Sequence, residues 1–321
     1  MKIFYDRRHL LHIPKKEMDN GKWVENADKP DRIEAIRESL ERHFGFSFNE
    51  PRDYYSSYLY LVHDHDYVHW LKKRSEGVEP GEEYFPEVFG YDKVFDTGTP
   101  ITRNSFFAAL NAVSASLNAV DEILTGETIV YALCRPPGHH ASSSQAGGYC
   151  YFNNAAIAAR YFQKYTHGYV AILDLDFHHG NGTQEIFYAD STVLYVSLHG
   201  DPEKFYPWIS GYDWEIGEED GVGYNFNFPL PGETTGTDYL RTLEKALAEI
   251  ENFDPDLLIV SLGFDTHKED PVGHFSLEDK DYYLIGKALK DLDFSIVLIQ
   301  EGGYNPDANM RASRNFFAGL L

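Results

Sequence analysis

Short, continuously apolar runs alternate with longer amphipathic stretches along the chain. Uninterrupted apolar runs are typical of strands whose two faces are both buried in a parallel sheet, and we expect such strands at 129–133, 170–175, 193–198, 257–262 and 295–299. Apolar residues at helical spacing predict helices at about 104–125, 153–166, 235–252 and 279–290, and a further helix at 32–43. Strands that alternate with helices predict an α/β fold with a mostly parallel central sheet flanked by helices.

Two segments interrupt this alternation. Residues 75–100 are rich in glycine, proline and acidic side chains, and residues 199–235 are rich in aromatic side chains. Long connections in compact proteins often line a site, so we expect both segments to contribute to one. The chain shows no internal repeat, and its 321 residues are compatible with one domain over 1–321.

Composition narrows the class of protein. Hydrophobic residues make up 43% of the chain and aromatic residues 15%, which indicates a packed globular protein and not a disordered one. The 51 acidic and 28 basic residues give a formal net charge of −23. This charge disfavours nucleic acid as a partner and favours the approach of cationic ligands. A generally acidic surface that promotes solubility is an equally weighted interpretation, so charge alone does not identify a substrate.

The two cysteines and the first residues of the sequence indicate in which cellular compartment the protein is expected. Cys134 and Cys150 both lie in apolar sequence and are too few for a disulfide framework, which predicts buried, reduced thiols in a cytoplasmic protein. The first residues turn to charge without the apolar core of a signal peptide. No apolar run approaches the length of a membrane span, so we expect no membrane partner.

Polar clusters follow four of the predicted strands directly. They lie at 135–140, 174–181, 263–266 and 300–304. The carboxyl ends of parallel strands share one edge of the sheet, where open α/β folds place their sites. We therefore expect the four clusters to converge on one site.

The cluster after residue 173 has the composition of a metal site. Asp174, Asp176 and His178 alternate, so an extended backbone would point all three to the same side. Their neighbours are apolar, which argues against a solvated loop, and buried carboxylates need a partner. Two carboxylates and one imidazole leave an open coordination position, as in catalytic zinc sites. We predict that Asp176, His178 and Asp265 bind a metal ion.

Three further side chains are candidates for proton transfer and charge stabilisation. His139 and His140 follow Pro-Pro-Gly at a predicted strand end. Adjacent residues project in different directions, so the pair is better suited to carry protons than to add two ligands. Tyr304 follows a Gly-Gly pair, and its phenol could donate a hydrogen bond to an oxyanion.

Six sequence blocks carry a resemblance to a known family. They are Arg135-Pro-Pro-Gly-His-His-Ala141, Gly147-Gly-Tyr-Cys-Tyr-Phe-Asn-Asn154, Asp174-Leu-Asp-Phe-His-His-Gly-Asn-Gly-Thr183, Ser197-Leu-His-Gly-Asp-Pro202, Gly263-Phe-Asp265 and Glu301-Gly-Gly-Tyr304. In this order they resemble the arginase-like deacetylase superfamily, and within it the bacterial acetylpolyamine amidohydrolases, relatives of the class II histone deacetylases. The resemblance implies the three-layer arginase/deacetylase fold and a single deacetylase domain.

The resemblance also implies a reaction and residue roles. The reaction is zinc-dependent hydrolysis of N-acetyl amides to acetate and a free amine. Asp176, His178 and Asp265 match the zinc ligands, with Fe²⁺ or Co²⁺ as alternative ions. His140 matches the general base, His139 its electrostatic partner or acid, and Tyr304 the residue that polarises the acetyl carbonyl. Asp174 matches the carboxylate that orients His139, and Asn181 stands beside His140 where class I enzymes have an aspartate.

Structural potassium is a further implication of the resemblance. One ion is expected near Asp174, Asp176, His178, Ser197 and Leu198, and a second near Phe187, Asp190, Val193 and Tyr224.

A substrate tunnel is implied as well. Tyr149 and Tyr206 match its aromatic walls, and Gly148 fits a close approach beside them. Polyamine enzymes carry a distal glutamate on an inserted loop that also helps to build a dimer, whereas this chain has Gly98 at that position. Asp96 is expected to serve as the rim carboxylate instead, and a homodimer is among the assemblies that the resemblance allows.

Four functions remain open from the sequence. We favour hydrolysis of small cationic acetylated amines, with deacetylation of acetyl-lysine in proteins as the alternative. A non-catalytic module that binds an acyl ligand and an arginase-like two-manganese site are weaker alternatives. The cluster His63-Asp-His-Asp-Tyr-Val-His69 is interpreted as a helix start, capped by Asp64 or Asp66, with histidines that face solvent.

Overall fold

A seven-stranded sheet forms the centre of the protein. The computed structural model describes residues 1–19, 21–87 and 93–321. In spatial order the strands are β1 (Lys2–Tyr5), β4 (Ile129–Leu133), β9 (Ile296–Gln300), β8 (Leu257–Leu262), β5 (Val170–Asp174), β6 (Val193–Gly200) and β7 (Asn225–Leu230). All neighbouring strands in this sheet pair in parallel. The predicted α/β class with a parallel sheet is confirmed.

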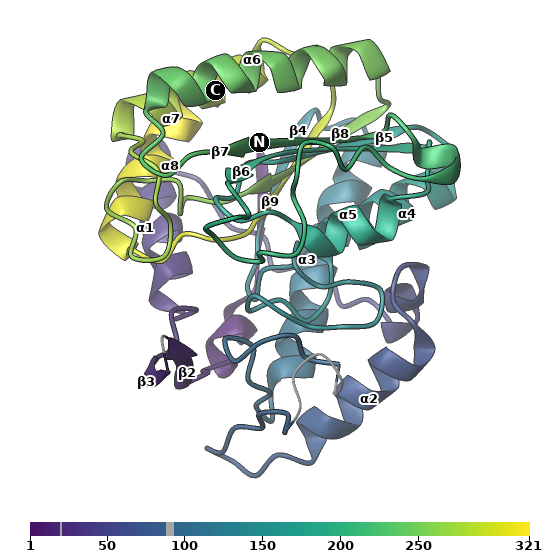
Figure 1. The fold of residues 1–321 in the computed structure, drawn as a ribbon, viewed down its shortest axis with the longest axis vertical. Helices are drawn as coiled ribbons and strands as arrows, with labels where there is room; N and C mark the ends of the chain where they lie inside the picture. Colours follow the sequence, from purple (N-terminus) through teal and green to yellow (C-terminus); the bar gives the residue numbers. More distant parts are fainter. Residues whose placement is uncertain (20, 88–92) are drawn as a thin grey trace.

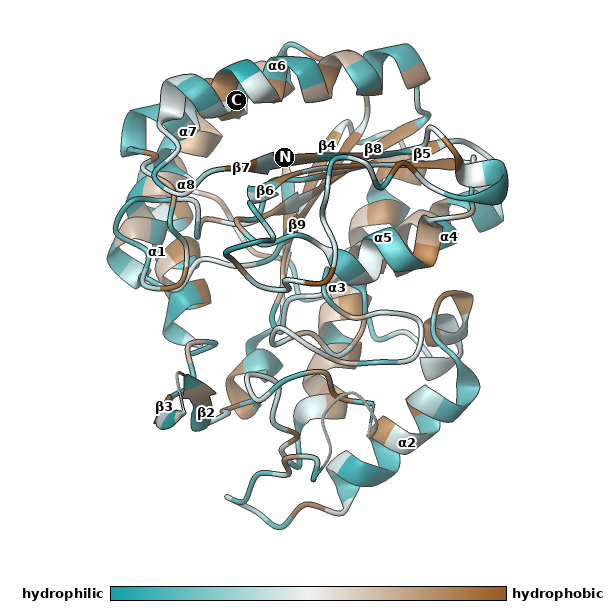
Figure 2. Cartoon of the chain, in the orientation of Figure 1, coloured by the Kyte–Doolittle hydropathy of each residue, from teal (hydrophilic) through white to brown (hydrophobic). Residues whose placement is uncertain are grey.

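Helices cover both faces of this sheet (Figure 1). One face carries α1 (Asp31–Phe44), α6 (Gly236–Phe253), α7 (Asp279–Lys290) and α8 (Pro306–Leu320). The other face carries α3 (Ser105–Leu124) and α4 (Asn154–Thr166), with α2 (His65–Glu76) packed beyond them and α5 (Asn181–Phe187) beside α4. Successive residues of each strand enter opposite cores: Val170 and Ile172 face α4, whereas Ala171 and Leu173 face α6 and α7. The central strands are accordingly mostly apolar, and polar residues lie on the outer helix faces (Figure 2).

A small hairpin and short helical turns complete the fold. β2 (Lys16–Asp19) and β3 (Lys22–Glu25) form an antiparallel pair near the lower end of α1 in Figure 1. The short 3-10 turns are η1 (Arg7–Leu11), η2 (Ser56–Leu61) and η3 (Glu219–Gly221). No helix among the described residues is both long enough and apolar enough to cross a membrane.

The structure corrects part of the predicted element pattern. The five predicted strands and five predicted helices are confirmed with small shifts at their ends. The interpretation of 199–235 as one long connection is wrong, because β6 continues to Gly200 and β7 occupies Asn225–Leu230. β7 alternates polar and apolar residues because it is the last strand of the sheet. Residues 88–92 of the predicted 75–100 connection lie outside the described residues.

The histidine cluster at the start of α2 also departs from its interpretation. Asp64 is the N-cap residue, but its side chain makes no capping hydrogen bond. His65 and His69 are exposed as expected. His63 is buried, and its two ring nitrogens lie 2.9 Å from the Ser142 carbonyl oxygen and 2.9 Å from the Asn153 amide nitrogen. His63 therefore ties α2 to the connection between β4 and α4, and its expected solvent exposure is wrong.

Candidate functional site

The four polar clusters meet at one edge of the sheet. Strands β4, β9, β8 and β5 are consecutive neighbours, and each of the four clusters follows one of them. Because all four strands run in parallel, their carboxyl ends open onto the same edge. The predicted convergence is confirmed by this strand order.

Asp176, His178 and Asp265 form a buried group with the spacing of metal ligands. One candidate ligand atom from each residue lies within 4.8 Å of the other two. His178 Nδ1 is 3.2 Å from Asp176 Oδ1 and 3.0 Å from Asp265 Oδ2. Ligands that hold zinc at its usual bond lengths in a tetrahedron are about 3.4 Å apart. The three residues therefore fit a zinc ion in both donor chemistry and separation.

Backbone amides fix the orientation of both carboxylates. Gly302 donates its N–H to Asp176 Oδ2 at 2.7 Å, and Phe177 donates its N–H to Asp265 Oδ1 at 2.9 Å. A Cβ at position 302 would lie 2.6 Å from Asp176 Oδ2, so only glycine allows this approach. Burial and the nearby Asp176 charge raise the pKa of Asp265 well above its usual range. A cation between the two carboxylates would relieve this repulsion.

Asp174 lies apart from the metal group. β5 ends at Asp174, and the backbone then turns, so the expectation that Asp174, Asp176 and His178 point to the same side of one extended strand is wrong. Asp174 Oδ2 instead lies 3.0 Å from His139 Nδ1 and accepts the Tyr195 hydroxyl at 2.9 Å. The turn after β5 separates a carboxylate that contacts His139 from the carboxylates that can contact a metal.

His139 and His140 lie in different electrostatic environments. Their ring centroids are 4.0 Å apart, and His140 Nδ1 lies 2.8 Å from Asn181 Oδ1. Burial lowers the pKa of His139, but the Asp174 and Asp176 carboxylates outweigh it and raise that pKa to about 10. Burial together with the neighbouring His139 and His178 lowers the pKa of His140 well below its usual value. The pair thus holds one protonated and one neutral imidazole side by side, as acid and base chemistry requires.

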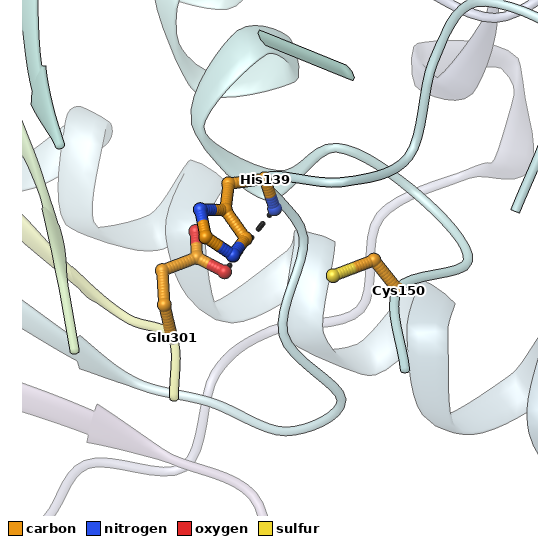
Figure 3. Close-up of side chains that lie close together, drawn as sticks. All are labelled: His139, Cys150 and Glu301. Atoms are coloured by element: carbon orange, nitrogen blue, oxygen red, sulfur yellow. Dashed lines mark hydrogen bonds between the residues drawn. The ribbon is translucent and has the colours of Figure 1, made fainter. Parts of the chain in front are cut away.

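Glu301 and Cys150 lie next to this histidine pair, and neither received a role from the sequence. The Glu301 carboxylate accepts the N–H of Gly138 at 2.6 Å and that of His139 at 3.2 Å (Figure 3). Ser261 donates its hydroxyl to the other carboxylate oxygen at 3.2 Å. Burial raises the pKa of Glu301 to about 7. The sequence could have identified Glu301 as a candidate, because it is a charged residue directly after the last apolar strand.

Tyr304 lies at the same edge as the metal group. Its backbone N–H donates to Asp270 Oδ2 at 2.6 Å, and its ring centroid is 5.4 Å from that of Tyr149. Burial and the Asp176 carboxylate raise the pKa of Tyr304 well above that of a free phenol. The hydroxyl therefore stays protonated at neutral pH and remains a hydrogen-bond donor.

A buried charged network lies behind Tyr304 and was not predicted. Asp28 Oδ1 accepts hydrogen bonds from Arg32 Nε at 2.7 Å and from Arg135 Nε at 3.0 Å. Arg32 also donates to the Glu301 carbonyl oxygen at 2.8 Å, and its guanidinium lies 5.5 Å from the centre of the Tyr304 ring. This network links α1 to the loops after β4 and β9 at this edge of the sheet.

The residues expected at a substrate tunnel lie together beside His140. The Tyr206 ring is 4.8 Å from the His140 ring, edge to face. Gly148 has φ +52°, and a Cβ there would lie 2.1 Å from His140 Cδ2, so this approach requires glycine. Asp96 Oδ2 accepts the Tyr206 hydroxyl at 2.6 Å and the Gly148 N–H at 2.7 Å. Asp96 therefore links Tyr206 to Gly148, and Tyr149 is the next residue in the chain.

The residues expected near potassium lie in two separate places. Ser197 and Leu198 are buried in β6 beside Asp174, and Ser197 Oγ is 2.8 Å from His199 Nδ1. In the second group the Asp190 carboxylate pairs with Arg160 at 2.6 Å. There the Phe187 carbonyl accepts the Asp190 N–H at 3.0 Å, and the Tyr224 carbonyl accepts the Tyr195 N–H at 2.9 Å. Val193 begins β6 close to these groups.

Comparison with known proteins assigns this site to a family. Residues 26–320 match the histone deacetylase domain. The chain belongs to the histone deacetylase family. Acetylpolyamine amidohydrolase 2 of Pseudomonas aeruginosa is 37% identical over 95% of this chain and 94% of that protein. Histone deacetylase 6 of Caenorhabditis elegans is 38% identical over 76% of this chain but only 26% of that protein.

A solved structure supports the same assignment. The crystal structure of acetylpolyamine aminohydrolase from Burkholderia pseudomallei matches this deacetylase with a TM-score of 0.95 at 34% identity, over 100% of this chain and 98% of that one. The predicted deacetylase fold and the family resemblance are therefore confirmed. Family membership makes the chain a hydrolase of the deacetylase type, and the general zinc dependence of the family agrees with its candidate metal group.

Proposed function

We propose that this deacetylase hydrolyses N-acetyl amides of small cationic amines, such as acetylpolyamines and acetyldiamines, to acetate and the free amine. The observation that carries the proposal is the convergence of Asp176, His178 and Asp265 beside the His139–His140 pair. Near full-length similarity to proteins named acetylpolyamine amidohydrolases supports the substrate class. A zinc ion held by the three ligands would polarise the amide carbonyl and lower the pKa of water.

The remaining side chains transfer protons and stabilise the negative charge that develops during the reaction. His140, kept neutral by its surroundings, accepts the proton of the attacking water, and Asn181 orients its ring. Tyr304 donates its hydroxyl to the oxygen on which negative charge develops. His139, whose pKa is raised and whose ring is oriented by Asp174, protonates the departing amine. Tyr149, Tyr206 and Gly148 confine the acyl-bearing chain and exclude water from it.

Glu17, at the edge of the tunnel, supports a cationic substrate. It lies on β2, and the Tyr149 hydroxyl donates to its carboxylate over 3.3 Å. Across residues 1–19, 21–87 and 93–321, no lysine or arginine lies within ion-pair distance of Glu17. Burial, with the nearby Asp96 and Asp19 charges, raises the pKa of Glu17 to about 7. An ammonium group arriving here would meet the Glu17 carboxylate, whereas Asp96, the expected rim carboxylate, is occupied by four hydrogen bonds.

A comparison of substrates tests the proposed function. We expect a higher kcat/KM for acetylputrescine than for an acetyl-lysine peptide, because a slim diamine can place its ammonium group near Glu17. The alternative, deacetylation of protein lysines, is favoured by the similarity to Histone deacetylase 6 of Caenorhabditis elegans. A higher kcat/KM for the peptide would establish that alternative. Absence of turnover on both, with ligand binding intact, would favour a non-catalytic acyl-binding module.

Replacing Glu17 with glutamine tests its role in substrate binding. We expect kcat/KM for acetylputrescine to fall about tenfold, the effect of losing 1.4 kcal/mol of interaction. The neutral analogue N-butylacetamide should be hydrolysed at an unchanged rate. In the wild type, KM for acetylputrescine should rise as pH falls through 7, because Glu17 is then protonated. Glu25→Gln on the neighbouring strand β3 is the control, and equal effects of the two substitutions would remove Glu17 from the site.

Several further properties belong to the same proposal. Zinc is the proposed resident ion, with Fe²⁺ or Co²⁺ able to use the same ligands. Structural potassium at the two predicted places, a single domain over 1–321 and a homodimer stay predictions. A cytoplasmic location also stays a prediction, supported by two free buried cysteines.

A further inference from the structure

We propose that His139, Cys150 and Glu301 form a second cation site, which binds a divalent ion such as Zn²⁺ or Cd²⁺ in excess and thereby inhibits the enzyme. One nitrogen, one sulfur and one carboxylate oxygen from these residues lie within 4.8 Å of one another. All three side chains are buried (Figure 3). His139 and Cys150 come from the connection between β4 and α4, and Glu301 comes from the connection between β9 and α8. The ligand atoms of Asp176, His178 and Asp265 likewise lie within 4.8 Å of one another.

Each side chain can offer one atom to a metal ion, His139 and Cys150 after each gives up a proton to water. His139 Nδ1 is engaged with Asp174, which leaves Nε2 as the ligand atom. Among the residues that the structure describes, Glu301 Oε1 accepts only the Ser261 hydroxyl, at 3.2 Å. The Cys150 thiol donates to the Gly148 carbonyl oxygen at 3.2 Å. On metal binding this S–H bond would break, its proton would pass to water, and the sulfur lone pair would form the bond to the ion.

The ligand types and the local charge select the kind of cation. A thiolate with an imidazole suits zinc or cadmium, whereas magnesium and calcium require oxygen ligands. Four carboxylates are buried here, those of Asp174, Asp176, Asp265 and Glu301. One divalent ion at the proposed catalytic position offsets only two of these negative charges. The remaining negative charge would favour a second cation.

The consequence for turnover rests on the proposed function. An ion on His139 Nε2 removes that imidazole from proton transfer to the leaving amine, without blocking Glu17 or the tunnel walls. We therefore expect excess Cd²⁺ to lower kcat and to leave KM for acetylputrescine nearly unchanged.

The two cysteines provide a matched pair for the experiment. Zinc-loaded wild type, Cys150→Ala and Cys134→Ala are titrated with Cd²⁺, while the thiolate-to-cadmium absorption in the ultraviolet and the deacetylase rate are followed together. Cys134 is also buried and free, but its thiol contacts the Gln300 carbonyl at 3.7 Å and is not part of the group. We expect one equivalent of thiolate-bound cadmium in the wild type and in Cys134→Ala, and none in Cys150→Ala. The inhibition constant of Cys150→Ala should be at least about tenfold weaker, since even the loss of an outer contact weakens metal sites by 10-fold to 100-fold.

The absorption separates this inference from the proposed catalytic site, which contains no sulfur. Cadmium that merely replaced zinc on Asp176, His178 and Asp265 would change activity without a thiolate band. A band and a second metal equivalent in a protein that hydrolyses no acetylated amine would support the second site and refute the proposed function. The inference is overturned if wild type shows no band, or if Cys150→Ala and Cys134→Ala are inhibited equally.

Discussion

Replacing His140 with alanine is expected to abolish measurable turnover while the metal content stays near that of the wild type. His140 lies beside the metal group, and the structure keeps it neutral and oriented by Asn181. Loss of a general base typically costs about 10²–10⁴-fold in rate. The metal content should persist because the three proposed ligands are untouched. Steady-state kcat and elemental analysis of the purified protein measure the two quantities.

A control separates this effect from general damage to the fold. His65 is exposed at the start of α2, so His65→Ala should retain both activity and metal. Retained activity in His140→Ala would remove the base assignment. Loss of metal in that variant would instead place His140 among the ligands.

The central fold was predictable because burial on both sides leaves a clear trace in the sequence. A strand such as β5, covered by helices on both faces, is apolar at every position from Val170 to Leu173, so the position of the strand is visible in the sequence. β1 has only four residues, and β7 alternates because it is the last strand of the sheet, so neither produces a long apolar run. The β2–β3 hairpin was missed because each of its strands has only four residues, and these are mostly exposed.

The candidate site was predictable where polar residues directly follow such strands. His139, Asp176, Asp265 and Tyr304 were found in this way, because strand order then brings them together. Glu17 was missed because it contacts Tyr149 from the hairpin, far from any strand end of the central sheet. The position of Asp174 was misjudged because the turn after β5 depends on tertiary contacts, such as the one between Phe177 N–H and Asp265.

Charge burial at this edge has opposite consequences for stability and for function. Asp176 and Asp265 face each other without solvent, and burial with the Asp176 charge raises the pKa of Asp265. A carboxyl group whose pKa is raised on folding destabilises the folded state once the pH exceeds the pKa of that group in the unfolded chain. Through Asp265, the metal-free folded state is therefore expected to lose stability as pH rises above about 4, the ordinary aspartate pKa. A bound cation reverses this cost, so metal binding and folding are coupled.

Replacing Asp265 with asparagine should separate these two consequences. We expect kcat/KM to fall by at least about 10³-fold, because a metal supplies several kcal/mol of charge stabilisation to the transition state. The metal-free variant should nevertheless have a Tm equal to or above that of the metal-free wild type, since one of two opposed buried carboxylates is gone. Thermal unfolding after chelation, and activity before it, measure the two effects.

Removal of the metal from the wild type with a chelator is a second test of the three proposed ligands. Hydrogen bonds to Asp176 and Asp265 outweigh burial and raise the pKa of His178 to about 9, so protons compete with the metal for its Nδ1 below that pH. Metal removal should therefore become easier as pH falls, and activity should return on addition of Zn²⁺. If the chelated enzyme worked undiminished, or if Asp265→Asn kept its activity, these three residues would not hold a catalytic metal. A variant that lost both activity and Tm would show that Asp265 acts mainly in folding.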